Sequence, residues 1–143
     1  MAQVRAAAVA DLLEHLVHRI QGISFARGLK PAQWVALRYL ARANESARNV
    51  TRFAQFHATS KSAASQTLGV LVKKGFVKAQ PDPNDPRIKT LNLTARGKRL
   101  IQDNPLGGLV DVLEGLQPEQ LEHFADVLEV LVKWTLESQA SSD

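Results

Sequence analysis

Hydroxyl, amide and ammonium side chains recur at helical spacing in the segment SKSAASQTLGVLVKKG, which begins at Ser60. A glutamine amide can pair bidentately with adenine, a serine hydroxyl can bond to either base of a pair, and lysine reaches guanine or a phosphate. One side of this helix therefore has the chemistry to contact base edges in a DNA major groove, and the alternative is an ordinary solvated helix face. The candidate DNA contacts from this segment are Ser60, Lys61, Ser62, Ser65, Gln66 and Lys73.

A turn with a basic flank follows that segment. FVKAQ and IKTLNL enclose PDPNDPR, whose Pro, Asp and Asn residues favour a turn, so the pattern predicts a β-hairpin with Arg87 and Lys89 on its edge. Arg87 follows Pro86, and a guanidinium at such a tip can enter a minor groove. The alternative is a pair with Asp82 or Asp85 within the protein. A solvated helix face alone does not predict a basic hairpin directly after it, so the two features together favour double-stranded DNA as a partner.

Apolar residues at helical spacing predict the elements that position these two features. Ser60 is suited to cap the candidate recognition helix, Gly75 to end it in a left-handed conformation, and Thr94 to cap the helix after the hairpin. The recognition helix should pack inward through Ala64, Leu68, Leu71 and Val72. We expect further helices at about 4–23 and 31–43, from Val50 to a turn at 57–59, at 94–102, and from Pro118 onward.

The composition bounds the class of protein. The chain has 143 residues and a formal net charge of +4, and most of its Lys and Arg residues lie between 48 and 99, as a local nucleic-acid-binding surface requires. Cysteine is absent, which excludes disulfides and thiolate metal sites. Charges interrupt the apolar N-terminal stretch, so we expect neither a signal peptide nor a membrane span, but a cytoplasmic protein without a cofactor.

Apolar stripes mark helices at both ends of the chain. Leu12 and Leu16 belong to the first stripe, and Phe124, Leu128 and Leu131 belong to the last. A single protomer offers few elements against which both stripes can be buried, so mutual burial with a second copy is the economical solution. We expect a homodimer.

The segment PDPNDPRIKTLNLTARGKRL resembles the wing of the MarR (multiple antibiotic resistance regulator) family, in which an Asp/Arg-rich loop leads to a strand and a Leu-Thr-x-x-Gly helix start. FAQFHATSKSAASQTLGVLVKKGFV is similar to that family's helix-turn-helix, and the similarity extends over nearly the whole chain. His57 and Thr59 stand where the family usually has apolar residues. Pro86 replaces a residue that is often basic, which leaves one arginine at the tip of the wing.

The resemblance implies a mainly α fold with a small β-hairpin wing, that is, a winged helix-turn-helix with N- and C-terminal dimerisation helices. It implies a single domain over residues 1–143, with a DNA-binding lobe at about 31–103 and dimerisation helices at about 4–28 and 105–138. Relatives are typically homodimeric repressors on pseudo-palindromic operators, which places two recognition helices about one DNA turn, near 34 Å, apart.

Relatives also release DNA when a small aromatic or phenolic effector binds. The residues that could line such a pocket here are His15, Trp34 and Tyr39, and the alternative is that these aromatic residues belong to an ordinary core.

Three other functions would require other residue patterns in the sequence. His15 and His18 share a helix face and could bind a metal with Glu14, Glu122 or His123, although the same pattern is common on dimer helices; we assign no metal site. A winged-helix protein-interaction module would lack the basic wing and the polar helix face. An enzyme would need converging acid, base or nucleophile groups, and the sequence supports no such set. We therefore predict a DNA-binding transcriptional regulator that is not an enzyme.

Overall fold

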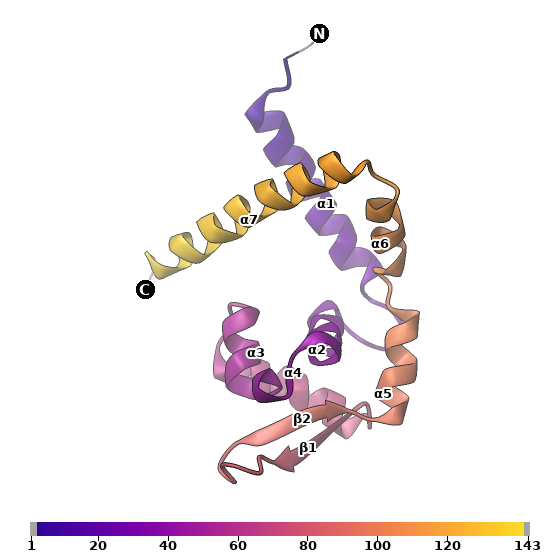
Figure 1. Ribbon diagram of the computed structural model, residues 1–143, viewed down its shortest axis with the longest axis vertical. Helices are drawn as coiled ribbons and strands as arrows, with labels where there is room; N and C mark the ends of the chain where they lie inside the picture. The colour runs from indigo at the N-terminus through magenta and orange to yellow at the C-terminus, as the bar shows by residue number, and fades with distance from the viewer. Residues whose placement is uncertain (1–2, 142–143) are drawn as a thin grey trace. The chain divides into compact units, whose positions relative to one another are not determined.

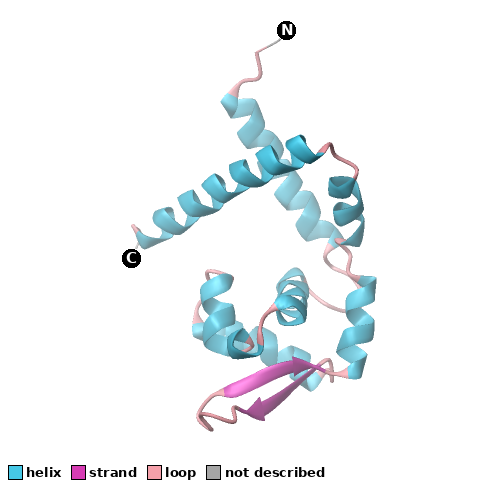
Figure 2. Ribbon diagram, viewed as in Figure 1, coloured by secondary structure: helices cyan, strands magenta, loops and turns pink. Residues whose placement is uncertain are grey.

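Helices dominate the structure, and two antiparallel strands form its sheet (Figure 1, Figure 2). The computed structural model describes residues 3–141. They form two compact units, one ending at Leu106 and one beginning at Gly107. The predicted fold class, mainly α with a β-hairpin wing, is confirmed.

The first unit carries the helix-turn-helix and the hairpin. Its elements in chain order are α1 (Ala6–Ile23), α2 (Pro31–Arg42), the 3-10 helix η1 (Glu45–Ala47), α3 (Val50–Phe56), α4 (Lys61–Lys73), β1 (Val77–Pro81), β2 (Lys89–Leu93), α5 (Ala95–Leu100) and the 3-10 helix η2 (Ile101–Asp103). Pro31 occupies the first turn of α2, where its missing N–H leaves no helical hydrogen bond unmade. The predicted helices and strands are therefore present, with ends displaced by a few residues.

The core of this unit lies where α2, α3, α4 and β1 meet. Trp34, Leu37, Phe53, Leu68 and Leu71 are its largest fully buried side chains. Burying a side chain of this size stabilises a fold by roughly 1.5–3 kcal/mol relative to leaving it exposed. The core thus holds α4 through one apolar face and leaves its opposite face in solvent.

The predicted caps of α4 and α5 are confirmed. The Ser60 Oγ accepts a hydrogen bond from the Ala63 N–H at 3.1 Å, and the Thr94 Oγ1 accepts one from the Gly97 N–H at 3.1 Å. Gly75 follows α4 with a φ of 81°, in the left-handed region that glycine adopts most readily. The two ends of α4 are therefore set by local chemistry.

Val72 does not pack inward as the apolar periodicity predicted. Its side chain is 38% exposed, whereas Ala64, Leu68 and Leu71 are buried as expected. Val72 directly follows Leu71, about 100° further round the helix, and this rotation carries it beyond the strip that α2, α3 and β1 cover. The apolar face of α4 is therefore narrower than its sequence indicates.

The hairpin pairs β1 with β2 in antiparallel register, with Val77 opposite Leu93 and Pro81 opposite Lys89. The backbone of Arg48 adds to β2, because its carbonyl accepts a 2.7 Å hydrogen bond from the Leu91 N–H. The Arg48 Nη1 also donates to the Asn92 Oδ1 at 2.8 Å. These bonds join the base of the wing to the chain that enters α3.

The remaining helices carry apolar side chains that the described protomer leaves exposed. The second unit consists of α6 (Gly107–Glu114) and α7 (Pro118–Ala140). Neither α1 nor α7 contains a buried residue; Leu12 is 66% exposed on α1, and Trp134 is 63% exposed on α7. Within residues 3–141, no helix is long and apolar enough to cross a membrane.

Candidate nucleic-acid interface

The exposed face of α4 has the composition expected of a recognition helix. Lys61, Ser62, Ser65, Gln66 and Lys73 are all exposed. No hydrogen bond between their side chains and another described group occupies this face. Their donors and acceptors are therefore available for a ligand. Ser60 differs from them because its hydroxyl caps α4.

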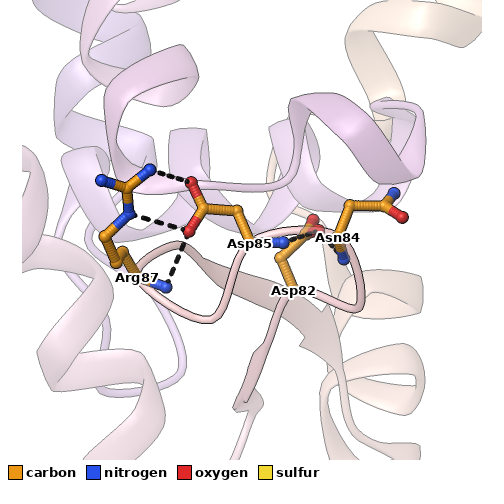
Figure 3. A network of polar contacts seen from close by, with 4 residues as sticks. All are labelled: Asp82, Asn84, Asp85 and Arg87. Carbon is orange, nitrogen blue, oxygen red and sulfur yellow. Dashed lines mark hydrogen bonds and ion pairs between the residues drawn. The ribbon is translucent and has the colours of Figure 1, made fainter.

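The wing loop is organised by two aspartates (Figure 3). The Asp82 carboxylate accepts hydrogen bonds from the Asn84 N–H at 2.8 Å and the Asp85 N–H at 3.2 Å, and it also bonds with the Thr90 hydroxyl. Asp85 accepts from Arg87 instead: from Nε at 3.0 Å, from Nη2 at 3.1 Å and from the backbone N–H at 3.1 Å. Of the two intramolecular partners predicted for Arg87, the structure selects Asp85.

This contact aims the guanidinium without burying it. The Arg87 side chain is 88% exposed, and Pro86 between the two partners restricts the backbone. The hydrogen bonds from the Arg87 side chain and backbone lower the pKa of the Asp85 carboxyl below its ordinary value. Asp85 therefore stays ionised at neutral and mildly acidic pH, which is the form that can accept the hydrogen bonds of Arg87.

The structure adds candidates that sequence patterns alone did not single out. Arg52 and Gln55 of α3 line one groove together with Arg87 and Lys89 of the wing. Gln55 and Arg87 are separated by thirty-one residues in the chain, so only the fold brings these side chains together. The available sequence signal was the concentration of basic residues between 48 and 99, which includes Arg52.

The three residues predicted to line an effector pocket have different environments. Trp34 is fully buried, and its indole Nε1 donates to the Ala26 carbonyl at 3.1 Å, which places it in the core. His15 lies exposed on α1. Tyr39 lines a cavity of about 390 Å³ on α2, together with Arg38, Arg42 and Phe56.

That cavity combines aromatic rings with positive charge. The rings of Tyr39 and Phe56 lie 4.9 Å apart between centroids, and Phe56 is 66% exposed. Burial lowers the pKa of Arg38, and repulsion from Arg42 lowers it further, so an anion placed here would relieve an unfavourable interaction. Sequence spacing did not identify Arg38, Arg42 or Phe56 as candidates.

The histidines of α1 belong to no recognisable metal centre. Across residues 3–141, no group of three or more His, Cys, Asp or Glu side chains is placed to hold a metal ion. His57 has a packing contact instead, because its ring stacks on Phe53 with centroids 5.6 Å apart and an interplanar angle of 10°. This stacking gives the polar ring of His57 an aromatic partner.

Residues 27–88 match the sequence profile of the MarR family. No curated protein matches the chain. Among solved structures, CouR from Rhodococcus jostii RHA1, bound to p-coumaroyl-CoA, is similar with a TM-score of 0.73 and 21% identity, covering 91% of this chain and 95% of CouR. The S. aureus MepR–DNA complex is similar with a TM-score of 0.70 and 17% identity, covering 92% of this chain and 98% of MepR.

A MarR transcriptional regulator from Methanosarcina mazei Go1 is also similar, with a TM-score of 0.69 and 22% identity over 92% of this chain and 95% of that protein. At these identities the structural likenesses establish the fold. Together with the matching profile, they make the lobe described above a winged helix of a known type.

Proposed function

We propose that this chain, whose residues 27–88 match the MarR family profile, is a sequence-specific, double-stranded-DNA-binding transcriptional regulator in the cytoplasm. The observation that carries the proposal is the free polar face of α4 beside a basic wing. A helix that only covered a core would not need Ser62, Ser65 and Gln66 on its solvent side, followed by an arginine aimed from a turn. A similar structure, S. aureus MepR, was solved in complex with DNA.

We propose that the regulator is a homodimeric repressor acting on a pseudo-palindromic operator. The apolar side chains exposed on α1 and α7 support self-association, because surfaces of this kind are usually covered. A two-fold dimer would present two copies of α4 to two half-sites, about one DNA turn apart.

We also propose a small aromatic or phenolic effector. The cavity lined by Arg38, Tyr39, Arg42 and Phe56 supports this proposal, since its volume suits a small molecule and its lining suits a ring that carries negative charge. The similar structure of CouR was solved with p-coumaroyl-CoA bound.

Selection of bound fragments from a genomic pool, followed by anisotropy titrations with the selected DNA and a scrambled duplex, tests the DNA-binding proposal. Gln66→Ala should weaken binding to the selected site by about 1–3 kcal/mol and binding to scrambled DNA much less. Gln139→Ala, which removes an exposed glutamine from α7, is the matched control and should change neither affinity.

Equal affinity of the wild-type protein for both duplexes at every salt concentration would contradict sequence-specific recognition. Absence of any DNA binding would favour the winged-helix protein-interaction module over the regulator.

A further inference from the structure

One cavity of the first unit lies where α2, the hairpin and the segment formed by α5 and η2 meet. These elements are in contact, since α2 touches β2 and η2, and α5 touches β2. The cavity measures about 760 Å³, a size that suits a small molecule. It shares no lining residue with the groove beside α3 or with the cavity around Tyr39, so it is a separate feature of this unit.

The polar part of the lining carries positive charge and side-chain amides, and it contains neither Asp nor Glu. Its residues are Arg48, Gln80, Asn92, Lys98 and Gln102. Within residues 3–141, neither Arg48 nor Lys98 forms a salt bridge. The described part of the chain therefore leaves two positive charges at this cavity without a carboxylate partner.

Arg48 is held in place by uncharged groups. It is half-buried; its Nε donates to the Ala43 carbonyl at 2.9 Å, and its Nη1 donates to the Asn92 Oδ1 at 2.8 Å. A guanidinium has five N–H donors, and these two bonds leave the donors of Nη2 unused by any described group. The side chain is thus oriented before a ligand arrives, which lowers the entropy cost of binding an anion there.

The other lining side chains indicate what kind of anion fits. Lys98 of α5 is exposed, and its ammonium makes no hydrogen bond within residues 3–141, so it is available to the same anion. The amides of Gln80 and Gln102 are equally free, and an amide that both donates and accepts suits a hydroxyl group. Leu40 and Ile101 add an apolar surface for a carbon skeleton. An inorganic ion would use only the charges, whereas a hydroxylated organic anion uses the whole lining.

We infer that this cavity binds a small, hydroxylated organic anion. Arg48 and Lys98 hold its phosphate or carboxylate group from two different elements. Gln80 and Gln102 bind its hydroxyl groups. This site goes beyond the proposed function, because it includes no residue of α4, of the loop at the tip of the wing or of the cavity proposed for a phenolic effector.

Isothermal titration calorimetry of the full chain without DNA tests this assignment. The probes are glycerol 3-phosphate, malate and uncharged glycerol. We expect at least one of the two anions to bind once per chain and glycerol not to bind, and the tighter anion identifies the preferred acidic group.

Two substitutions should each weaken this binding by about tenfold or more, because hydrogen bonds to charged groups are among the strong ones. Asn92→Asp keeps an oxygen that can accept from the Arg48 Nη1, but it supplies the missing negative charge and so competes with the ligand. Lys98→Gln removes the second cation at an exposed position, where little of the fold depends on it. Circular dichroism checks that each variant is folded, and the exposed position of Lys98 keeps the test valid if Asn92→Asp is not.

Arg99→Gln serves as the control for general charge, because Arg99 is an exposed arginine of α5 outside the cavity lining. It should bind the anion as the wild type does, and an equal loss in Arg99→Gln and Lys98→Gln would overturn the inference in favour of a diffuse positive field. Loss of binding in Arg38→Gln but not in Lys98→Gln would place the anion in the cavity around Tyr39 and overturn the assignment. Failure of both anions to bind the wild-type protein at millimolar concentration would also overturn it, whether or not the protein binds DNA.

Discussion

At the scale of single residues, Asp85 could affect DNA binding in two opposite directions, and a substitution can tell them apart. Its carboxylate holds Arg87 by two side-chain hydrogen bonds, yet it is also a negative charge close to the proposed path of DNA. If only net charge mattered, Asp85→Asn would strengthen DNA binding. If the positioning of the Arg87 side chain matters more, the same substitution would weaken DNA binding, because a free guanidinium loses conformational entropy on binding.

We predict that Asp85→Asn weakens DNA binding by about 0.5–1.5 kcal/mol, the usual cost of immobilising one long side chain. Fluorescence anisotropy at fixed salt measures the change. Glu45→Gln is the control, since it removes an exposed carboxylate from the same unit without disturbing Arg87. Tighter binding by both variants would contradict the positioning role of Asp85.

Single residues also show how far the sequence predicts the candidate site. The exposure of Ser62, Ser65 and Gln66 follows from helical periodicity, which is a local property of the chain. The groove shared by Arg52 and Lys89 depends on how α3 packs beside the hairpin, and local periodicity contains no information about that packing. The DNA-contacting roles of all these residues remain predictions.

At the scale of elements, most of the fold could be predicted because its helix ends carry recognisable chemistry. Pro31 and Pro118 open helices, Ser60 and Thr94 cap them, and Gly75 ends one. The deviation of Val72 shows the limit, since the width of a buried face depends on the neighbouring elements.

The structure explains why residue 97 is a glycine. It stands where a capping box would place Glu or Gln, but a Cβ at this position would overlap the Phe76 carbonyl oxygen. The same oxygen accepts a hydrogen bond from the Thr94 N–H at 3.0 Å. Close approach of α5 to the chain before β1 therefore excludes a side chain, and the cap is completed by Thr94 alone.

Most of the residues that line the proposed effector site belong to α2. Val35, Arg38 and Arg42 lie three or four residues apart on α2 and line one cavity with Tyr39 and with Phe56 of α3, so a ligand there would touch one face of α2 and the end of α3. We predict that 4-hydroxybenzoate, as an anionic phenolic probe, releases wild-type protein from DNA at concentrations that leave Arg38→Gln bound. DNA-release titrations followed by anisotropy measure this difference.

Two controls separate charge from shape in that experiment. The uncharged 4-hydroxybenzyl alcohol should release wild-type protein less effectively than the acid, because it cannot pair with Arg38. Arg19→Gln removes an exposed arginine of α1 that does not line the cavity and should respond as the wild type does. Equal release of wild type and Arg38→Gln by the acid would exclude a role for this guanidinium.

At the scale of the whole molecule, the exposed apolar side chains of α1 and α7 predict the oligomeric state. Light scattering at micromolar concentration should give twice the 15.7 kDa mass of one chain. Leu12→Glu should shift the mass toward that of one chain. The substitution places a charge at a position that is exposed in the protomer and would be buried in the proposed dimer. Gln21→Glu adds the same charge at a polar position of α1 and should leave the dimer intact. A wild-type mass near 15.7 kDa would refute the dimer.

The apolar stripes of α1 and α7 have a consequence for how DNA binding depends on the amount of this protein in the cell. If two chains must associate before they can occupy an operator, then at concentrations well below the dimer dissociation constant the amount of active species rises with the square of the amount of chain. Halving synthesis would then reduce the DNA-binding species about fourfold. The same exposed side chains would make the regulated gene respond more steeply to changes in the level of this protein than one-to-one binding allows.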